Sequence, residues 1–248
     1  MTSDQGHSGV AMEVKIFCGY MLICGSLFLV KPQMPAGGIF PKLEGEGFGI
    51  ACFYVQVVGF QMMQALLAQC PGPRGIQMAM MAMIGGMAFH IFSLSVIPSP
   101  QLMVGVVLVF VTTIISGKTN MDKHDSKLSQ YAFIVWNVVQ GVVFITTRNS
   151  GTGTPLITDS YPGVASVEGA LAATNVLCEV SAMMSLVLVF LQCPGALGRA
   201  MAMTATVALT GYHYSQDIMP PPPVVVLATV SAVASWMAYA AKKKAKSS

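Results

Sequence analysis

The sequence predicts an all-α, polytopic membrane protein, a helix bundle of about eight transmembrane helices built as two parallel four-helix repeats. Composition, apolar segments of membrane-spanning length and an internal duplication predict this fold class. Hydrophobic residues make up 54% of the 248 residues and charged residues only 9%, whereas charged residues make up about a quarter of a typical soluble domain. The low charge therefore excludes an ordinary soluble domain.

Eight segments are long and apolar enough to cross a bilayer, which takes about 20 residues of helix. The fourth segment is short and the seventh holds His213 and Gln216, so six or seven spans is the alternative. In chain order, the predicted spans are 12–30, 48–69, 75–97, 101–117, 129–147, 168–191, 198–216 and 222–241.

The sequence Gln-Cys-Pro-Gly at 69–72 recurs at 192–195, an offset of 123 residues. Self-similarity at a fixed spacing indicates a repeated structural unit. The chain therefore divides into a first repeat at 1–117, an inside linker at 118–128 and a second repeat with a basic tail at 129–248. At the same offset, further matches pair Gly75 with Gly198, Met78 with Met201, His90 with His213, Pro98 with Pro221 and Pro100 with Pro223.

The topology follows from span parity and from the positive charges. Each repeat has an even number of spans, so both copies enter the membrane from the same side and are parallel. Ten of the thirteen Lys and Arg residues then lie on one side, and only Lys31, Lys42 and Arg148 on the other. Because positive loops stay inside, both termini are expected inside. The membrane is expected to be that of an organelle, with plastid, mitochondrion and endoplasmic reticulum left open.

Two outside connections, at 31–47 and 148–167, are rich in Gly and Pro and occupy equivalent places in the repeats. Connections of this length are uncommon unless they cover something or touch a partner. The Cys-Pro-Gly segments are expected to form inside corners, where Pro ends a helix and Gly permits the reversal.

Buried polar residues mark the first candidate site, because an ionisable group within a span is costly and usually functional. Glu179 lies midway along the sixth span, with Asn175 one helical turn earlier. Asn137 and Gln140 lie near mid-depth on the fifth span, and we expect the four side chains to share one ligand-binding pocket. At the 123-residue offset Glu179 corresponds to the neutral Gln56. The alternative is that a protonated Glu179 bonds to these amides and only holds the helices together.

His90 and His213 form the second candidate site, for a metal or a pigment. Imidazole commonly ligates metals, so the pair could hold haem iron or chlorophyll magnesium. The alternative is a pair of hydrogen-bonded histidines near the membrane interface. Across both sites the candidate cofactors are a lipid, a quinone or chlorophyll.

Several function classes are disfavoured. The six cysteines include no CxxC, and the nineteen methionines follow no fixed spacing, which argues against zinc, thioredoxin and copper chemistry. Neither GxxxxGK[ST] nor GxGxxG occurs, so no nucleic acid or nucleotide is expected as a partner. No catalytic residue stands out, because no nucleophile is paired with a base. An enzyme is therefore disfavoured, although this question stays open.

The second repeat resembles the DoxX-like four-helix membrane family. The resemblance rests on a second-helix acid, a Gly- and Arg-containing corner and a third helix ending near His. The first repeat departs from the pattern, since Gln56 replaces the acid and Arg74 precedes Gly75. The resemblance implies either a quinone-linked redox subunit or a distant relation to cargo receptors. The matching residues are Glu179, Gly195, Gly198, Arg199 and His213.

Three functions are compatible with these observations. The first is an accessory or scaffold subunit of a larger photosynthetic or respiratory membrane complex, with lipids and other membrane subunits as partners. The second is a DoxX-like quinone-linked redox partner with its site at Glu179. The third is an endoplasmic-reticulum cargo receptor, for which Lys244 and Lys246 of the C-terminal tail would form a lysine retrieval signal.

Overall fold

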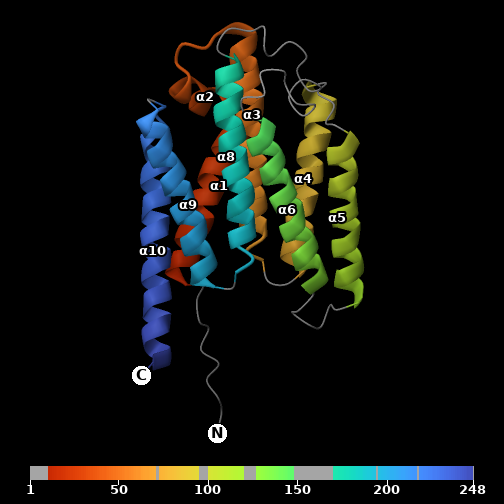
Figure 1. Cartoon of the computed structure of the whole chain (residues 1–248), viewed down its shortest axis with the longest axis vertical. Helices are drawn as coiled ribbons and strands as arrows, with labels where there is room; N and C mark the ends of the chain where they lie inside the picture. The colour runs from red at the N-terminus through yellow and green to blue at the C-terminus, as the bar shows by residue number, and fades with distance from the viewer. Residues whose placement is uncertain are drawn as a thin grey trace.

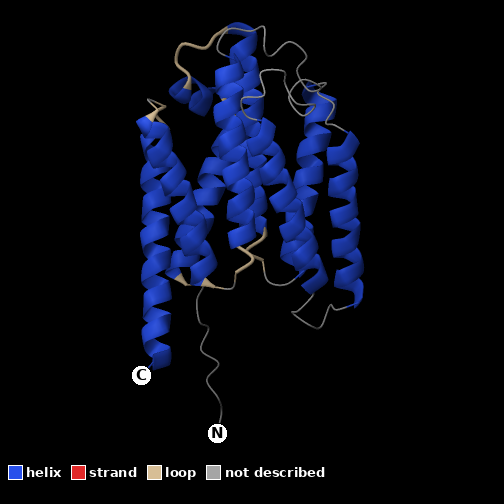
Figure 2. Ribbon diagram, in the orientation of Figure 1, coloured by secondary structure: helices blue, strands red, loops and turns tan. Residues whose placement is uncertain are grey.

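The structure is a computed structural model that describes residues 11–70, 73–94, 100–119, 127–147, 170–193, 195–216 and 218–247. These residues form helices joined by turns, and they contain no strand (Figure 2). The predicted all-α bundle is therefore confirmed for the described part of the chain. The helices are α1 (Met12–Val30), α2 (Gln33–Ile39), α3 (Gly45–Leu67), α4 (Pro73–Leu94), α5 (Pro100–Thr119), α6 (Lys127–Thr147), α8 (Ala170–Phe190), α9 (Ala196–Ser215) and α10 (Pro222–Ser247).

The long helices stand side by side and alternate in direction (Figure 1). The start of α1 and the end of α10 lie at one end of the bundle, and the short α2 lies at the other end. The expected loop at 31–47 is thus partly helical, because α2 forms within it. The connection at 148–167 and most of the linker at 118–128 lie outside the described residues.

Five helices are long and apolar enough to cross a membrane, which supports an integral membrane protein. They are α1, α3, α6, α8 and α10. In the searched, described residues, α5 contributes only the shorter apolar segment Met103–Thr112. The helix α9 includes Arg199, His213, three threonines and two tyrosines, and these polar groups lower its hydropathy. Eight spans therefore stays a prediction.

The outer surface of the bundle is apolar over several helices. On α6, large hydrophobic side chains are exposed at alternating spacings of three and four residues, and α5 and α10 expose further valines. Such extended apolar surface is uncommon on soluble monomers and marks contact with lipid or with protein. The exposed stripe on α6 consists of Leu128, Tyr131, Val135, Val138, Val142 and Ile145.

The packing of the long helices has a regular pattern. The helices α3 and α8 pack against each other at the centre of the bundle (Figure 1). The first four long helices are α1, α3, α4 and α5, and their counterparts in the second half are α6, α8, α9 and α10. When each helix is replaced by its counterpart, the list of contacting long-helix pairs stays the same. The contacting pairs are α1–α3, α3–α4 and α4–α5, their counterparts α6–α8, α8–α9 and α9–α10, the closing pairs α5–α6 and α1–α10, and the smaller pairs α4–α6 and α1–α9.

Two glycines show how closely the first helices of the two halves correspond. A Cβ atom on Gly25 of α1 would lie 3.2 Å from Met62 Cβ and 3.4 Å from Gly59 O. A Cβ atom on Gly141 of α6 would lie 3.4 Å from Ser185 Cβ and 3.5 Å from Ala182 O. The contacted residues are 123 apart in the sequence, but Gly25 and Gly141 are only 116 apart. The first helices are thus shifted by seven residues, the difference between 123 and 116.

The shifted register also aligns two buried aromatic residues on each of these helices. Phe17 and Phe133 are fully buried, and Phe28 and Phe144 are nearly so. Each pair is separated by 116 residues. A search at the single offset of 123 misses this match, because the second half has seven more residues between its first two long helices.

The Cys-Pro-Gly corners depend on a second glycine three residues further along. A Cβ atom on Gly75 would overlap Cys70 O, and a Cβ atom on Gly198 would overlap Cys193 O and lie 2.5 Å from Phe190 O. Gly195, at the start of α9, has φ +76°, a conformation that glycine adopts readily. Both corners therefore require glycine for close backbone approach.

Candidate functional site

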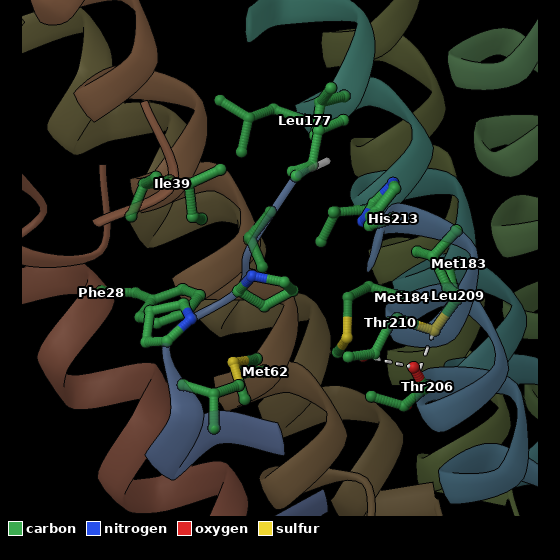
Figure 3. A pocket seen from close by; sticks show the side chains of 18 of the residues that line it. Phe28, Ile39, Met62, Leu177, Met183, Met184, Thr206, Leu209, Thr210 and His213 are labelled. Carbon is green, nitrogen blue, oxygen red and sulfur yellow. Dashed lines mark hydrogen bonds between the residues drawn. The ribbon is translucent and has the colours of Figure 1, made fainter. Parts of the chain in front are cut away.

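A cavity lies between the two halves of the bundle, toward the end that holds α2. Its volume is about 80 Å³, and a single water needs roughly 10–15 Å³, so it has room for several non-hydrogen atoms. Phe28 and Met62 line it from the first half, and Leu177, Met183 and Leu209 line it from the second half (Figure 3). The wall is thus mainly apolar.

The end of the cavity near α2 is covered by short segments. Ile39 of α2 lines it, as do Ile218, Pro220 and Pro221 of the turn between α9 and α10. A Cβ atom on Gly38 would lie 3.8 Å from Pro221 Cγ. The short helix α2 therefore packs on the proline-rich turn directly beside the cavity.

His213 is the polar group of greatest chemical interest in this wall (Figure 3). Its Nε2 atom lies 2.9 Å from Oε2 of Glu179, and the two residues are only 3% and 7% exposed. His213 lies in the last turn of α9. Because both side chains are buried, this hydrogen bond is stronger than it would be at a surface.

The contact also determines what the imidazole can offer a ligand. When Nε2 donates to the carboxylate, neutral histidine has Nδ1 as an acceptor, and protonated histidine has Nδ1 as a second donor. A carboxylate that holds one ring nitrogen orients the whole ring. The pair can therefore present one fixed hydrogen-bonding atom beside an apolar cavity.

The structure brings together one residue from each of the two predicted sites, Glu179 and His213. Asn137 donates from Nδ2 to Phe133 O within its own helix, at 2.9 Å. Gln56 donates from Nε2 to Leu29 O of α1, at 3.2 Å. The first of these bonds lies within α6, and the second joins α3 to α1.

The structure gives the burial of two further predicted residues. Asn175 is half-buried on α8, and Gln140 is buried on α6. His90 belongs to α4, but its side chain lies outside the described residues. The helices α4 and α9 lie on opposite sides of the central α3–α8 pair (Figure 1). Nothing in the described part of the chain groups three or more His, Cys, Asp or Glu side chains as metal ligands.

An ion pair at the opposite end of the bundle was not predicted from the sequence. Arg199 Nη2 lies 3.3 Å from Glu13 Oε1, and Nη1 donates to Gln69 Oε1 at 3.4 Å. Both charged side chains are nearly buried, at 11% and 7% exposure. Because Arg199 belongs to the second half and its partners to the first, this group ties the two halves together.

A polar contact between the central helices was also missed. Gln61 Nε2 of α3 donates to Ser181 O of α8 at 3.1 Å and to Ser185 Oγ at 3.4 Å. The four-residue spacing of the two serines places them on one helical face. That spacing was the available sequence signal, but uncharged residues in a span did not stand out.

Comparison with protein-family models, with curated proteins and with solved structures finds no match to this chain. The resemblance to the DoxX-like family therefore stays a prediction from the residues that carry it. Functional inference rests on the geometry of the cavity and of the buried pairs.

Proposed function

We propose that this membrane protein binds a lipophilic small molecule, a lipid or a quinone, in the cavity between its two halves. The observation that carries the proposal is an apolar cavity with a buried imidazole in its wall, held by a carboxylate at 2.9 Å. Small-molecule sites typically combine apolar lining with a few fixed polar groups. His213 is the proposed polar contact, and Glu179 is the residue that orients it.

The lining supports this division of roles. Met62, Met183 and Met184 supply flexible, polarisable side chains, which adapt to irregular apolar shapes. Thr206 and Thr210 also line the cavity, and their hydroxyls donate to carbonyls one turn earlier, Ala202 O and Thr206 O. With these hydroxyl protons used inside the helix, His213 is the side chain best suited to bind a ligand oxygen.

The proposal includes eight spans arranged as two parallel repeats with both termini inside. The exchange symmetry of the helix contacts supports the repeat. So do the matched contacts of Gly25 and Gly141. The excess of Lys and Arg at the end shared by the start of α1 and the end of α10 supports the orientation.

A second candidate function, an accessory subunit of a larger membrane assembly, is favoured by the exposed stripe on α6. The stripe repeats at three and four residues, the spacing with which one helix packs along another. This role is compatible with ligand binding. The quinone-redox and cargo-receptor roles rest on sequence patterns alone.

Photoaffinity labelling tests the ligand site. Protein in native membranes would be labelled with a fatty acid that carries a diazirine and an alkyne, and modified peptides mapped by mass spectrometry. Leu209→Trp fills the cavity, and we expect labelling of the α8 and α9 peptides to fall about tenfold, equivalent to about 1.4 kcal/mol of binding. Leu186→Trp is the matched control, since Leu186 is 44% exposed on α8. Equal labelling of the Leu209→Trp variant and the unmodified protein would contradict the proposal.

A further inference from the structure

We infer that the interface among α3, α6 and α8 holds a group of buried water molecules within the membrane-embedded bundle. The polar seam is defined here as Gln61, Gln140, Thr174, Ser181 and Ser185. All five are less than 9% exposed. This site is separate from the cavity and does not depend on the proposed lipid or quinone.

The seam lies along one face of α8. Thr174, Cys178, Ser181 and Ser185 follow one another at spacings of four, three and four residues, which places them on one side of a helix. Ser181 and Ser185 contact Gln61 of α3, and Ser185 Cβ faces Gly141 of α6. Gln140 precedes Gly141, so its side chain starts at the same level of the bundle.

Four oxygen atoms of the seam lack a hydrogen-bond partner in the described structure. They are Gln61 Oε1, Gln140 Oε1, Thr174 Oγ1 and Ser181 Oγ, and all are buried. Buried polar atoms nearly always bond to protein or to ordered water. Exchanging the oxygen and nitrogen of the Gln61 amide would not give every atom a partner, because it would place the amide oxygen against the carbonyl oxygen Ser181 O, to which Nε2 donates. We therefore assign water as the hydrogen-bond partner of these four oxygens.

The chemistry of the four atoms suits water in particular. Amide oxygens accept hydrogen bonds, whereas hydroxyls both donate and accept. A water molecule can donate to Gln61 or Gln140 and accept from Ser181 or Thr174. Buried waters typically make about three such bonds, so a few molecules can satisfy the seam.

The interface between α1 and α3 corresponds to the interface between α6 and α8. It shows that helices packed in this way do not need polar side chains between them. There the corresponding side chains are hydrophobic or weakly polar, and the two interfaces share the Gly25 and Gly141 contacts. The corresponding pairs are Val58 and Ser181, Met62 and Ser185, and Cys24 and Gln140. The polar residues that α6 and α8 contribute to the seam therefore have no polar counterparts at these positions of α1 and α3.

Hydroxyl-radical footprinting by synchrotron X-rays tests the inference, because radicals form from bound water and oxidise adjacent side chains. Cys178 lies in the face of the seam and Cys24 in the apolar interface, and both are nearly inaccessible, at 0% and 2% exposure. Irradiation of the full-length protein in H₂¹⁸O should oxidise Cys178 several-fold faster than Cys24, with ¹⁸O incorporated. Equal, slow oxidation of the two thiols would overturn the inference.

A variant locates the water. The double variant Gln140→Met/Ser181→Ala removes two of the four oxygens that lack a protein partner. Oxidation of Cys178 in this variant should fall to the rate of Cys24. Unchanged oxidation of Cys178 in this folded variant would overturn the placement. If the variant does not fold, the comparison of Cys178 with Cys24 in the unmodified protein still decides the question. Neither result depends on labelling of the cavity, so failure of one proposal is distinguishable from failure of the other.

Discussion

The α1–α3 and α6–α8 helix pairs are built alike but differ in their interior chemistry. Gly25 and Gly141 make equivalent close contacts with the facing helix, and Phe17 and Phe133 are both fully buried. The α1–α3 pair carries Cys24, Val58 and Met62 where the α6–α8 pair carries Gln140, Ser181 and Ser185. The comparison teaches that two helix pairs can share the same close spacing while the side chains of their interiors differ.

The divergence is clearest at the residues that carry charge. At the offset of 116 residues, Glu13 corresponds to Ser129. At the offset of 123 residues, Glu179 corresponds to Gln56, and Arg199 corresponds to Ile76. The buried ion pairs in the described residues accordingly lie along α9 and its neighbours. Intramembrane charge is expensive and usually functional, so function is expected on that side of the bundle.

The corner glycines offer the most severe test of the shared framework. In Gly75→Ala and Gly198→Ala the added Cβ would overlap a backbone carbonyl, so the backbone itself would have to shift. We expect each substitution to lower the free energy of unfolding by about 3 kcal/mol, measured by titration with SDS in mixed micelles.

Gly211→Ala is the matched control for the second corner. No atom lies within 4 Å of a Cβ at Gly211, so we expect this change to raise the stability of α9 by about 0.5 kcal/mol. A large loss at one corner and none at the other would show that the two corners are not equivalent.

A reciprocal exchange of the acid and the amide sharpens the chemical difference between the halves. In Glu179→Gln, the amide oxygen can still accept from His213 Nε2, so we expect a loss of about 1 kcal/mol. In Gln56→Glu, an ionised carboxylate cannot donate to Leu29 O, and we expect a loss of about 2–3 kcal/mol.

Thermal unfolding in detergent would rank these two variants. Gln56→Met is the control, because it removes the hydrogen bond to Leu29 O without adding an acid. If Glu179→Gln were the more damaging exchange, the charge on Glu179 would contribute more than a hydrogen bond to His213 alone.

The smallest expected difference lies at the matched glycines. A Cβ on Gly25 would lie 3.2 Å from both Met62 Cβ and Met63 Sδ, whereas the closest atom to a Cβ on Gly141 is at 3.4 Å. We expect Gly25→Ala to cost about 1 kcal/mol and Gly141→Ala to change stability by less than about 0.5 kcal/mol. The same mixed-micelle titration measures both, and equal costs would show that the two helix pairs are equally tight.

Much of the helical fold could be predicted from the sequence, because spans are long and apolar. The predicted first span, 12–30, coincides with α1. The helix α2 was missed because seven residues with Pro and two glycines give little helical signal. The seven-residue register shift was missed because it falls in a connection and not in a motif.

The candidate site was predicted only as separate parts. Glu179 and His213 were each identified, but they lie 34 residues apart on different helices, and a sequence pattern gives a helical face without naming its neighbour. Arg199 was identified only as part of a corner, and Glu13 was not singled out. Their pairing depends on α1 lying against α9, which is a property of the tertiary packing.

The Arg199–Glu13 bridge has a consequence for biosynthesis. Its two residues are separated by 186 positions in the chain, and ribosomes add about 5–20 residues per second. For roughly 10–40 s, therefore, the first helix has been made but its arginine has not. Until then Glu13 is best accommodated at the watery surface of the membrane. The first helix can consequently reach its final packing only after α9 has been synthesised and has packed against it.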